Sequence, residues 1–474
     1  MPQPPFSARV SPLSRHQEAY RPQNPLRLPV LSITSPIGSR FDRFDWLPVH
    51  LVWPMRASWL PTSLAPASIE NSEMSRTTLR SVGRKAIGVA LDPKRNSLNF
   101  LRLVLAFSVV YAHASELGWF GLHDVVVNNT SLGTVAVYGF FGISGYLIAG
   151  SASRNSVGRY LWQRFLRIFP AFWVCLVVTG FALGAIALAI DPMPRCGYEC
   201  YLGLHPGPTS YVYSNALLKI NQFGAAGPAV FLGNGSLWTL FYEFLCYLLL
   251  AALSFIGIMR HRGWVALITL GIFAALLVTT LVPNLNSMFN GQSNFVVMNF
   301  MVLTLGFLGG TLIYLYRERV PDSALLAIVC ITAFVATQYL PTGGHQWSFR
   351  LTPSNFGVFL LAYPLLWLGA HLPFSWIGAK NDYSYGVYIY AYPLTQLLVS
   401  LGAERVGFWP FMLLTALVTL AFAVASWWLI EKRALQLKKA SWPIGRLMPA
   451  TVVPGVHETP GGLGESEKPE VVGD

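Results

Sequence analysis

The sequence predicts an all-α, polytopic membrane protein with about ten transmembrane helices. Three observations lead to this prediction. Of the 474 residues, 53% are hydrophobic and only 11% are charged, whereas charged residues make up about 25% of a soluble domain. Apolar runs of about 20 residues, the length that a membrane-spanning helix needs, recur along the chain. The Lys and Arg residues, which give a formal net charge of +12, gather in short segments between these runs.

The predicted spans follow one another without a soluble catalytic domain between or after them. They cover residues 97–117, 132–151, 168–190, 236–258, 263–282, 295–316, 322–340, 356–372, 383–402 and 408–430. Because their number is even, both termini are expected on the same side of the membrane.

The positive residues predict the orientation, since cytoplasmic connections carry an excess of Lys and Arg. Alternate connections and the two flanking tails carry Arg84, Lys85, Lys94, Arg95, Arg154, Arg159, Arg164, Arg167, Arg260, Arg262, Arg317, Arg319, Lys380, Lys432, Arg433, Lys438 and Lys439. The opposite connections carry only Arg195, Lys219, Arg350 and Arg405. We therefore predict a multi-pass protein of the inner (plasma) membrane with both termini in the cytoplasm. This distribution explains the basic charge without a nucleic-acid partner.

Composition divides the chain into three parts. Residues 1–95 are rich in Pro, Ser and Arg, and we interpret them as a disordered N-terminal extension or as residues upstream of the true start, at Met55 or Met74. Residues 96–438 form the transmembrane domain, and residues 439–474 a disordered cytoplasmic tail. Three of the five cysteines lie in apolar runs, so the sequence suggests neither a disulfide framework nor a zinc site with four ligands. We expect no bound metal and no tightly bound cofactor. Whether Cys196 and Cys200 pair stays open.

The first span, "NFLRLVLAFSVVYAHAS", carries Arg102 and His113 on one helical face, because eleven residues bring a helix back to nearly the same direction. Ionisable residues inside a membrane are costly and usually face a functional cavity. In the fourth span, "GSLWTLFYEFLCYLLL", Glu243 lies about seven residues from the outer end. Since depth counts put both groups in the outer half of the membrane, we predict that Glu243 and His113 meet and activate a hydroxyl. A purely structural pair is the alternative.

Two further motifs flank the third span. Arg164 and Arg167, in "RFLRIFP", lie three residues apart and therefore share a face. Guanidinium groups suit phosphate oxygens, so this pair is a candidate site for a phosphorylated donor. Control of topology or contact with lipid headgroups is the alternative. In "YGFFGISGYLIAGS", Ser144 and Gly145 allow close helix packing, which we favour for Ser144 over a role as an acyl carrier.

Taken in order, these motifs resemble the acyltransferase-3 family of integral membrane O-acyltransferases. They are Arg102 and His113 with ten intervening residues, "FFGISGYLI", "RFLRIFP", "SLWTLFYEF", "YSYGVYIYAYP" at 383–393 and "WWLIEKR" at 427–433. The resemblance covers about residues 97–438. In one departure, many members have His-Trp-Pro near the ninth span, where this chain has Tyr390, Ala391, Tyr392 and Pro393. No second histidine can be assigned there.

The resemblance implies an enzyme that moves an acyl group, commonly acetyl, from cytoplasmic acyl-CoA to a hydroxyl of a saccharide or lipid-linked glycan. It implies that Arg102, Arg164 and Arg167 bind the donor, and that His113 and Glu243 are catalytic. Ser144, Tyr385 and Tyr388 are supporting candidates. Whether His113 acts as a general base or carries the acyl group stays open, as does the identity of the acceptor.

Two other functions fit the composition. A secondary transporter also places ionisable residues inside the membrane, but many transporters have two similar halves. Here the Arg, His and Glu features lie in the first four predicted spans, which favours an enzyme. An inactive scaffold that recruits a glycan-export complex is the third function.

Overall fold

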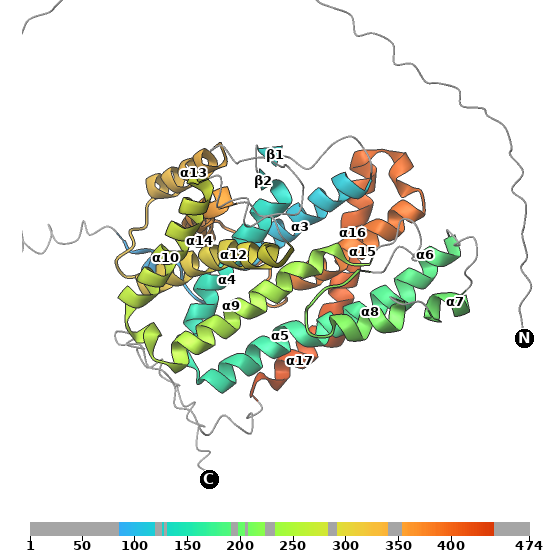
Figure 1. Cartoon of the computed structure of the whole chain (residues 1–474), viewed down its shortest axis with the longest axis horizontal. Coiled ribbons are helices and arrows are strands. Elements are labelled where there is room, and N and C mark those ends of the chain that lie inside the picture. Colours follow the sequence, from blue (N-terminus) through green and yellow to red (C-terminus); the bar gives the residue numbers. More distant parts are fainter. Residues whose placement is uncertain are drawn as a thin grey trace, which may run out of the picture. The chain divides into compact units, whose positions relative to one another are not determined.

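The computed structural model describes residues 85–118, 126–127, 130–190, 198–203, 207–222, 233–282, 292–339 and 353–439. These ranges are almost entirely helical, as predicted (Figure 1). Strand pairing within them is limited to an antiparallel pair, β1 (Val126–Val127) and β2 (Thr130–Ser131), and an isolated bridge between Ala86 and Pro321. Most of the predicted N-terminal extension, residues 1–84, and nearly all of the predicted tail, residues 440–474, lie outside the described ranges.

Seven helical segments in the described part of the chain are long and apolar enough to cross a membrane. They are α3 (Leu98–Leu117), α4 (Leu132–Arg154), α5 (Val157–Val177) continued by a π-helical turn and α6 (Gly184–Ile190), α9 (Trp238–Phe255), α10 (Arg262–Leu281), α12 (Gln292–Leu315) and α16 (Phe408–Ser426) continued to α17 (Lys432–Gln436).

The other three predicted spans coincide with shorter helices. They are α13 (Ala324–Gln338), a 3₁₀ segment (Pro353–Leu361) followed by α14 (Ala362–His371), and α15 (Ser384–Ser400). Helix α13 has 15 residues and is therefore about 22 Å long, less than the roughly 30 Å of a bilayer's hydrocarbon core. The predicted count of ten spans is not confirmed.

Helix α4 lies inside the helix bundle, where it packs against α3, α9, α12 and α14 (Figure 1). A Cβ atom on Gly145 would lie 1.9 Å from the carbonyl oxygen of Phe307 on α12. A Cβ atom on Gly310 would lie 2.0 Å from the carbonyl oxygen of Gly142. The α4 and α12 backbones therefore touch, which confirms the prediction that small residues in this span allow close packing.

We expect Gly145→Val to destabilise the protein by roughly 1–3 kcal/mol or more, because the added methyl groups would force α4 and α12 apart. Gly271→Val on α10 is the matched control, since a Cβ atom there meets nothing within 4 Å. Thermal unfolding of the purified variants in detergent checks the expectation. Equal midpoints for the two variants would contradict the close packing.

The folded part of the chain begins before the predicted boundary at residue 95. Helix α2 (Ile87–Ala90) packs against α14, and the Ile87 side chain is fully buried. The backbone N–H of Ile87 donates to the carbonyl oxygen of Val320 at 2.9 Å, and the backbone N–H of Asp322 donates to the carbonyl oxygen of Lys85 at 2.7 Å. These bonds join residues 85–90 to the connection between α12 and α13.

Two short helices, α7 (Tyr198–Gly203) and α8 (Pro208–Asn215), follow α6. Helix α8 packs along α5, and the Trp173 indole N–H donates to the carbonyl oxygen of Ala216 at 2.9 Å (Figure 1). At the other end of α5, α17 and the 3₁₀ turn after it (Leu437–Lys439) also pack against this helix. Helix α5 thus contacts α8 along one part and the end of the described chain along another.

Candidate functional site

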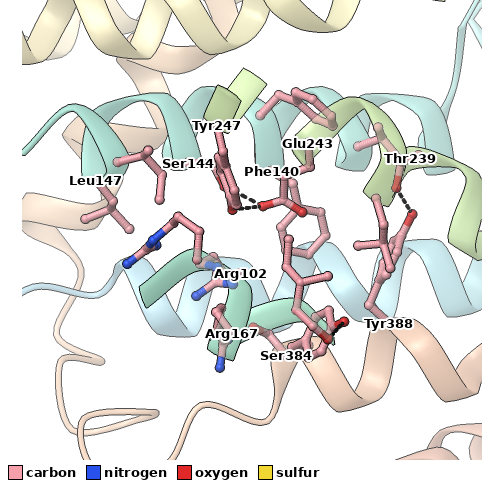
Figure 2. Close-up of a pocket in the computed structure, with 17 residues that line it drawn as sticks. Arg102, Phe140, Ser144, Leu147, Arg167, Thr239, Glu243, Tyr247, Ser384 and Tyr388 are labelled. Carbon is pink, nitrogen blue, oxygen red and sulfur yellow. Dashed lines mark hydrogen bonds between the residues drawn. The ribbon is translucent and has the colours of Figure 1, made fainter. Parts of the chain in front are cut away.

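A pocket lies between α3, α4, α5, α9 and α15 and encloses about 770 Å³ between its atoms, part of it open to solvent (Figure 2). Seven of the eight site residues that the sequence predicts line it: Arg102, Ser144, Arg164, Arg167, Glu243, Tyr385 and Tyr388. The eighth, His113, does not. Motifs separated by up to about 280 residues therefore converge on one cavity, which composition and spacing alone did not establish.

One end of the pocket is formed by paired arginines (Figure 2). Arg102 from α3 and Arg167 from α5 both donate to the Asp382 Oδ2 atom at 2.6 Å. Arg167 also lies 3.4 Å from the carboxylate of Glu431. The side chains of Asp382 and Glu431 are only 15% and 2% exposed, so these ion pairs are shielded from water. Two of the three arginines predicted to bind a donor thus have carboxylate partners.

Asp382 joins three helices at this end. Its second oxygen, Oδ1, accepts from the backbone N–H of Ser384 at 3.2 Å and from the Ser384 hydroxyl at 2.6 Å, at the start of α15. Burial alone would raise the pKa of this carboxyl. The Arg102 and Arg167 guanidinium groups and the Ser384 hydrogen bonds outweigh that effect and hold the pKa well below its ordinary value. Asp382 is therefore a fixed negative charge at neutral pH.

Sequence reasoning missed Asp382 and Glu431. Both lie beside or within motifs that carry the family resemblance, since Asp382 directly precedes "YSYGVYIYAYP" and Glu431 belongs to "WWLIEKR". The available signal was an acidic residue at the basic end of an apolar span, where a neighbouring arginine is the expected partner.

We expect Asp382→Asn to lower the free energy of unfolding by roughly 1–3 kcal/mol, because two partly buried arginines lose a charged partner. The folded-state pKa of Asp382 is depressed, so its ionised carboxylate stabilises the fold at full strength above the ordinary aspartate pKa of about 3.9. This stabilisation is lost only as the pH falls through the lower, folded-state pKa. The difference between the thermal-unfolding midpoints of wild type and Asp382→Asn, measured in detergent, should therefore be the same at pH 7 and pH 5. Exposed Asp92→Asn is the control. A difference that disappears by pH 5 would contradict the assignment.

Arg164 differs from the other two arginines. It makes no ion pair with any described residue, and its buried Nε atom has no hydrogen-bond partner. Its guanidinium carbon lies 5.9 Å from the centre of the Tyr247 ring. Among the three predicted donor-binding arginines, Arg164 is the one whose charge no carboxylate in the described residues neutralises.

Glu243 lies further along the pocket, with its carboxylate directed into it (Figure 2). The carboxylate accepts a short hydrogen bond from the Tyr247 hydroxyl, one turn later on α9, and a 3.5 Å bond from the Ser144 hydroxyl on α4. Gly145 makes the close approach to α12, whereas Ser144 lines the cavity. Close helix packing, the role that we favoured for Ser144, is therefore carried by the neighbouring Gly145.

Tyr388 and Thr239 form the side of the pocket opposite Arg102 and Arg167 (Figure 2). Their hydroxyls share a short hydrogen bond, and the Tyr388 hydroxyl lies 2.7 Å from the carbonyl oxygen of Ser236. These contacts join α15 to the beginning of α9.

His113 lies outside the pocket, against the Tyr392 ring one turn after Tyr388. The two ring centres are 4.8 Å apart and the rings meet edge to face. The buried Nδ1 atom of His113 has no hydrogen-bond partner in the described residues, and Glu243 bonds to Tyr247 and Ser144 instead. The described residues thus show no direct hydrogen bond between His113 and Glu243, and the other form of the predicted pairing, through one water, stays a prediction. Depth counts give the position along a helix axis and leave the lateral position of each side chain undetermined.

The described residues contain no group of three or more His, Cys, Asp and Glu side chains placed to hold a metal ion. The pocket instead combines guanidinium groups at one end with a carboxylate, a serine hydroxyl and tyrosine hydroxyls further in. Such a cavity can hold an anionic ligand at one end and move a proton at the other.

Comparison with known proteins identifies the family. The family model described as an acyltransferase domain, that of acyltransferase-3, matches residues 95–428. The chain belongs to the acyltransferase-3 family. It is therefore an acyltransferase that acts on hydroxyls, built on a multi-pass membrane domain. The matched range includes every site residue predicted above.

Individual acyltransferase-3 relatives agree with this assignment. The chain is 28% identical to an O-acetyl transferase of Shigella phage Sf6 over 72% of this chain and 96% of that protein. It is 28% identical to Nodulation protein 10 of Rhizobium leguminosarum bv. viciae over 73% and 94% of the two chains. A shorter match, 30% identical over 32% of this chain and 37% of the other, is to Acyltransferase MdmB of Streptomyces mycarofaciens. No solved structure matches the chain significantly.

Proposed function

We propose that this acyltransferase-3 protein transfers an acyl group, expected to be acetyl, from cytoplasmic acyl-CoA to a hydroxyl of a saccharide or lipid-linked glycan. Acyl-CoA is a co-substrate in this proposal, and no cofactor is tightly bound. The enzyme lies in the inner (plasma) membrane among its lipids, with both termini cytoplasmic. The name of the phage relative, O-acetyl transferase, supports acetyl as the group.

The observation that carries the proposal is the arrangement of charge along the pocket. Arg164 and the paired arginines lie at one end, and Glu243 with the Ser144 hydroxyl lies further in. A CoA thioester has a matching order of groups along its length. Its phosphates lie at one end, and its reactive carbonyl lies at the far end of an uncharged arm. With the phosphates beside the guanidinium groups, the arm points along the pocket toward Glu243.

The chemical step then follows from ordinary acyl transfer. The acceptor hydroxyl loses its proton to a base and attacks the thioester carbonyl, the carbon–sulfur bond breaks, and the CoA thiolate leaves and takes up a proton. Glu243 is the carboxylate that lines the pocket, and His113 remains the predicted catalytic imidazole. In the structure His113 does not line the pocket, and its ring lies against that of Tyr392 on α15. Direct transfer and an acyl-enzyme intermediate both remain compatible with the proposal.

A labelled-donor experiment tests this function. Purified protein in lipid vesicles is incubated with radiolabelled acetyl-CoA and with membranes of the source organism as the acceptor supply. We expect release of free CoA and label in the saccharide fraction, both dependent on added membranes. No CoA release with active, folded protein would favour the scaffold alternative, and label entering the vesicles while still attached to CoA would favour a transporter.

A further inference from the structure

Charge at the arginine end of the pocket is not balanced. Arg102 and Arg167 have the carboxylates of Asp382 and Glu431 as partners, whereas Arg164 has none in the described part of the chain. A fourth cation, Lys438, comes from the 3₁₀ turn that ends the described residues, and its ammonium group makes no ion pair with them. Arg164 and Lys438 are thus two cations with no carboxylate within ion-pair distance in the described part of the chain.

Lys438 is brought to α5 by packing of the last turn. The Leu437–Lys439 turn contacts α5, and the Trp162 indole N–H donates to the carbonyl oxygen of Leu437 at 3.3 Å. Helix α17, just before this turn, lies beside α5 (Figure 1). The turn is therefore held on the helix that carries Arg164. Lys438 follows the end of the family match at residue 428, so membership of the family assigns it no role.

The charges around Lys438 indicate its surroundings. Burial, together with the Arg164 and Arg167 guanidinium groups, lowers the pKa of Lys438 to about 8, and the Asp382 carboxylate opposes them. The charged residues of its own segment are Glu431, Lys432, Arg433 and the adjacent Lys439. Lys438 thus lies partly buried among cations, an arrangement that an additional anion would stabilise.

Arg164 gives a second, independent indication of an anion. Its side chain lines the pocket, and its buried Nε atom has no hydrogen-bond partner among the residues that the structure describes. A buried N–H donor without an acceptor costs free energy that a bound acceptor oxygen would recover. Phosphate oxygens match a guanidinium fork, and a lysine ammonium adds a point charge to the same anion.

We propose that Arg164 and Lys438 together form a phosphate-binding site at the mouth of the pocket, and that Arg102 and Arg167 act as positioning residues held by Asp382 and Glu431. The occupant is the phosphate part of the acyl donor, an assignment that rests on the function proposed above. Arg164 faces the pocket and Lys438 lies outside its lining, so the site takes the phosphates where the uncharged arm enters.

Binding measurements on the purified full chain in detergent test the site. The probes are desulfo-coenzyme A, which has the donor's phosphates but cannot react, and inorganic pyrophosphate. We expect Lys438→Met and Arg164→Gln each to weaken binding of both probes by about tenfold, the effect of losing one charged hydrogen bond. Exposed Lys94→Met and Arg159→Gln are the matched controls and should bind as wild type does.

The pH dependence separates a charge effect from a structural one. Because Lys438 loses its proton as the pH rises past about 8, wild-type affinity for desulfo-coenzyme A should fall between pH 7 and pH 9. Donor phosphates, with a second pKa of about 6, are already largely ionised at pH 7 and gain little further charge by pH 9. Lys438→Arg keeps its charge and should lose this dependence while retaining affinity.

Each outcome decides between the two proposals. If wild type binds desulfo-coenzyme A but Lys438→Met and Arg164→Gln bind it equally well, the site is wrong and the proposed function stands. If pyrophosphate binds in a Lys438-dependent way but desulfo-coenzyme A does not, the anion site stands and the CoA donor is wrong. If wild type binds neither probe, both proposals fail.

Discussion

Replacement of Glu243 by glutamine is expected to reduce the turnover of acyl transfer by about 100-fold or more. Glutamine has nearly the same shape and still accepts from Tyr247 and Ser144, so the pocket should keep its form. The amide cannot take up a proton or balance a positive charge that develops during the reaction. Because the change is remote from the donor phosphates, the apparent donor affinity should stay close to that of wild type.

The matched control for Glu243→Gln is Glu318→Gln, since the Glu318 side chain is 55% exposed and lies outside the pocket. Turnover is measured as CoA release at saturating acetyl-CoA. A Glu243→Gln enzyme with nearly normal turnover would leave the carboxylate with a structural role only. A large loss of donor affinity at unchanged turnover would instead place Glu243 in donor binding.

His113→Ala is expected to lower turnover by about 100-fold to 10,000-fold, the usual contribution of general acid–base catalysis, with the protein still folded and inserted. The structure supports the second part of this expectation. The buried Nδ1 atom of His113 has no partner in the described residues, so removing the imidazole leaves no partner atom unsatisfied and mainly loses the edge contact with Tyr392. Exposed His261→Ala is the control.

Acylation by the His113→Ala enzyme at close to the wild-type rate would remove His113 from the mechanism and leave Glu243 as the base. A normal unfolding midpoint with lost turnover would keep His113 in the chemistry. A lower unfolding midpoint together with lost turnover would indicate a structural role. His113→Gln, which keeps a polar side chain of similar reach, would then separate packing from proton transfer.

The sequence predicted which residues line the pocket better than it predicted the contacts that their side chains make. The long apolar runs correctly located helices, because apolar length is a direct requirement of a bilayer. Arg102, Arg164, Arg167 and Glu243 converge on one pocket because intramembrane charges turn inward, where a polar cavity lowers their cost. This principle needs no knowledge of tertiary contacts.

Lateral positions and helix ends depend on tertiary packing and were not accessible in the same way. His113 lies against Tyr392 and makes no direct hydrogen bond to Glu243 in the described residues, since helix rotation and lateral packing decide such contacts as much as depth does. Asp382 comes from a connection that periodicity does not describe, and its two arginine partners are about 215 to 280 residues away. The predicted span 322–340 likewise exceeds α13 by two residues at each end, because apolar length does not fix where a helix begins and ends.

A structure of the protein with desulfo-coenzyme A bound, determined by cryo-electron microscopy in lipid nanodiscs, tests the central claim that this pocket holds the acyl donor. The account predicts phosphate oxygens within hydrogen-bonding distance of Arg164, and the uncharged arm lying along the pocket toward Glu243 and Ser144. Density for the analogue at another place on the protein, with the pocket between α3, α4, α5, α9 and α15 left empty, would contradict it.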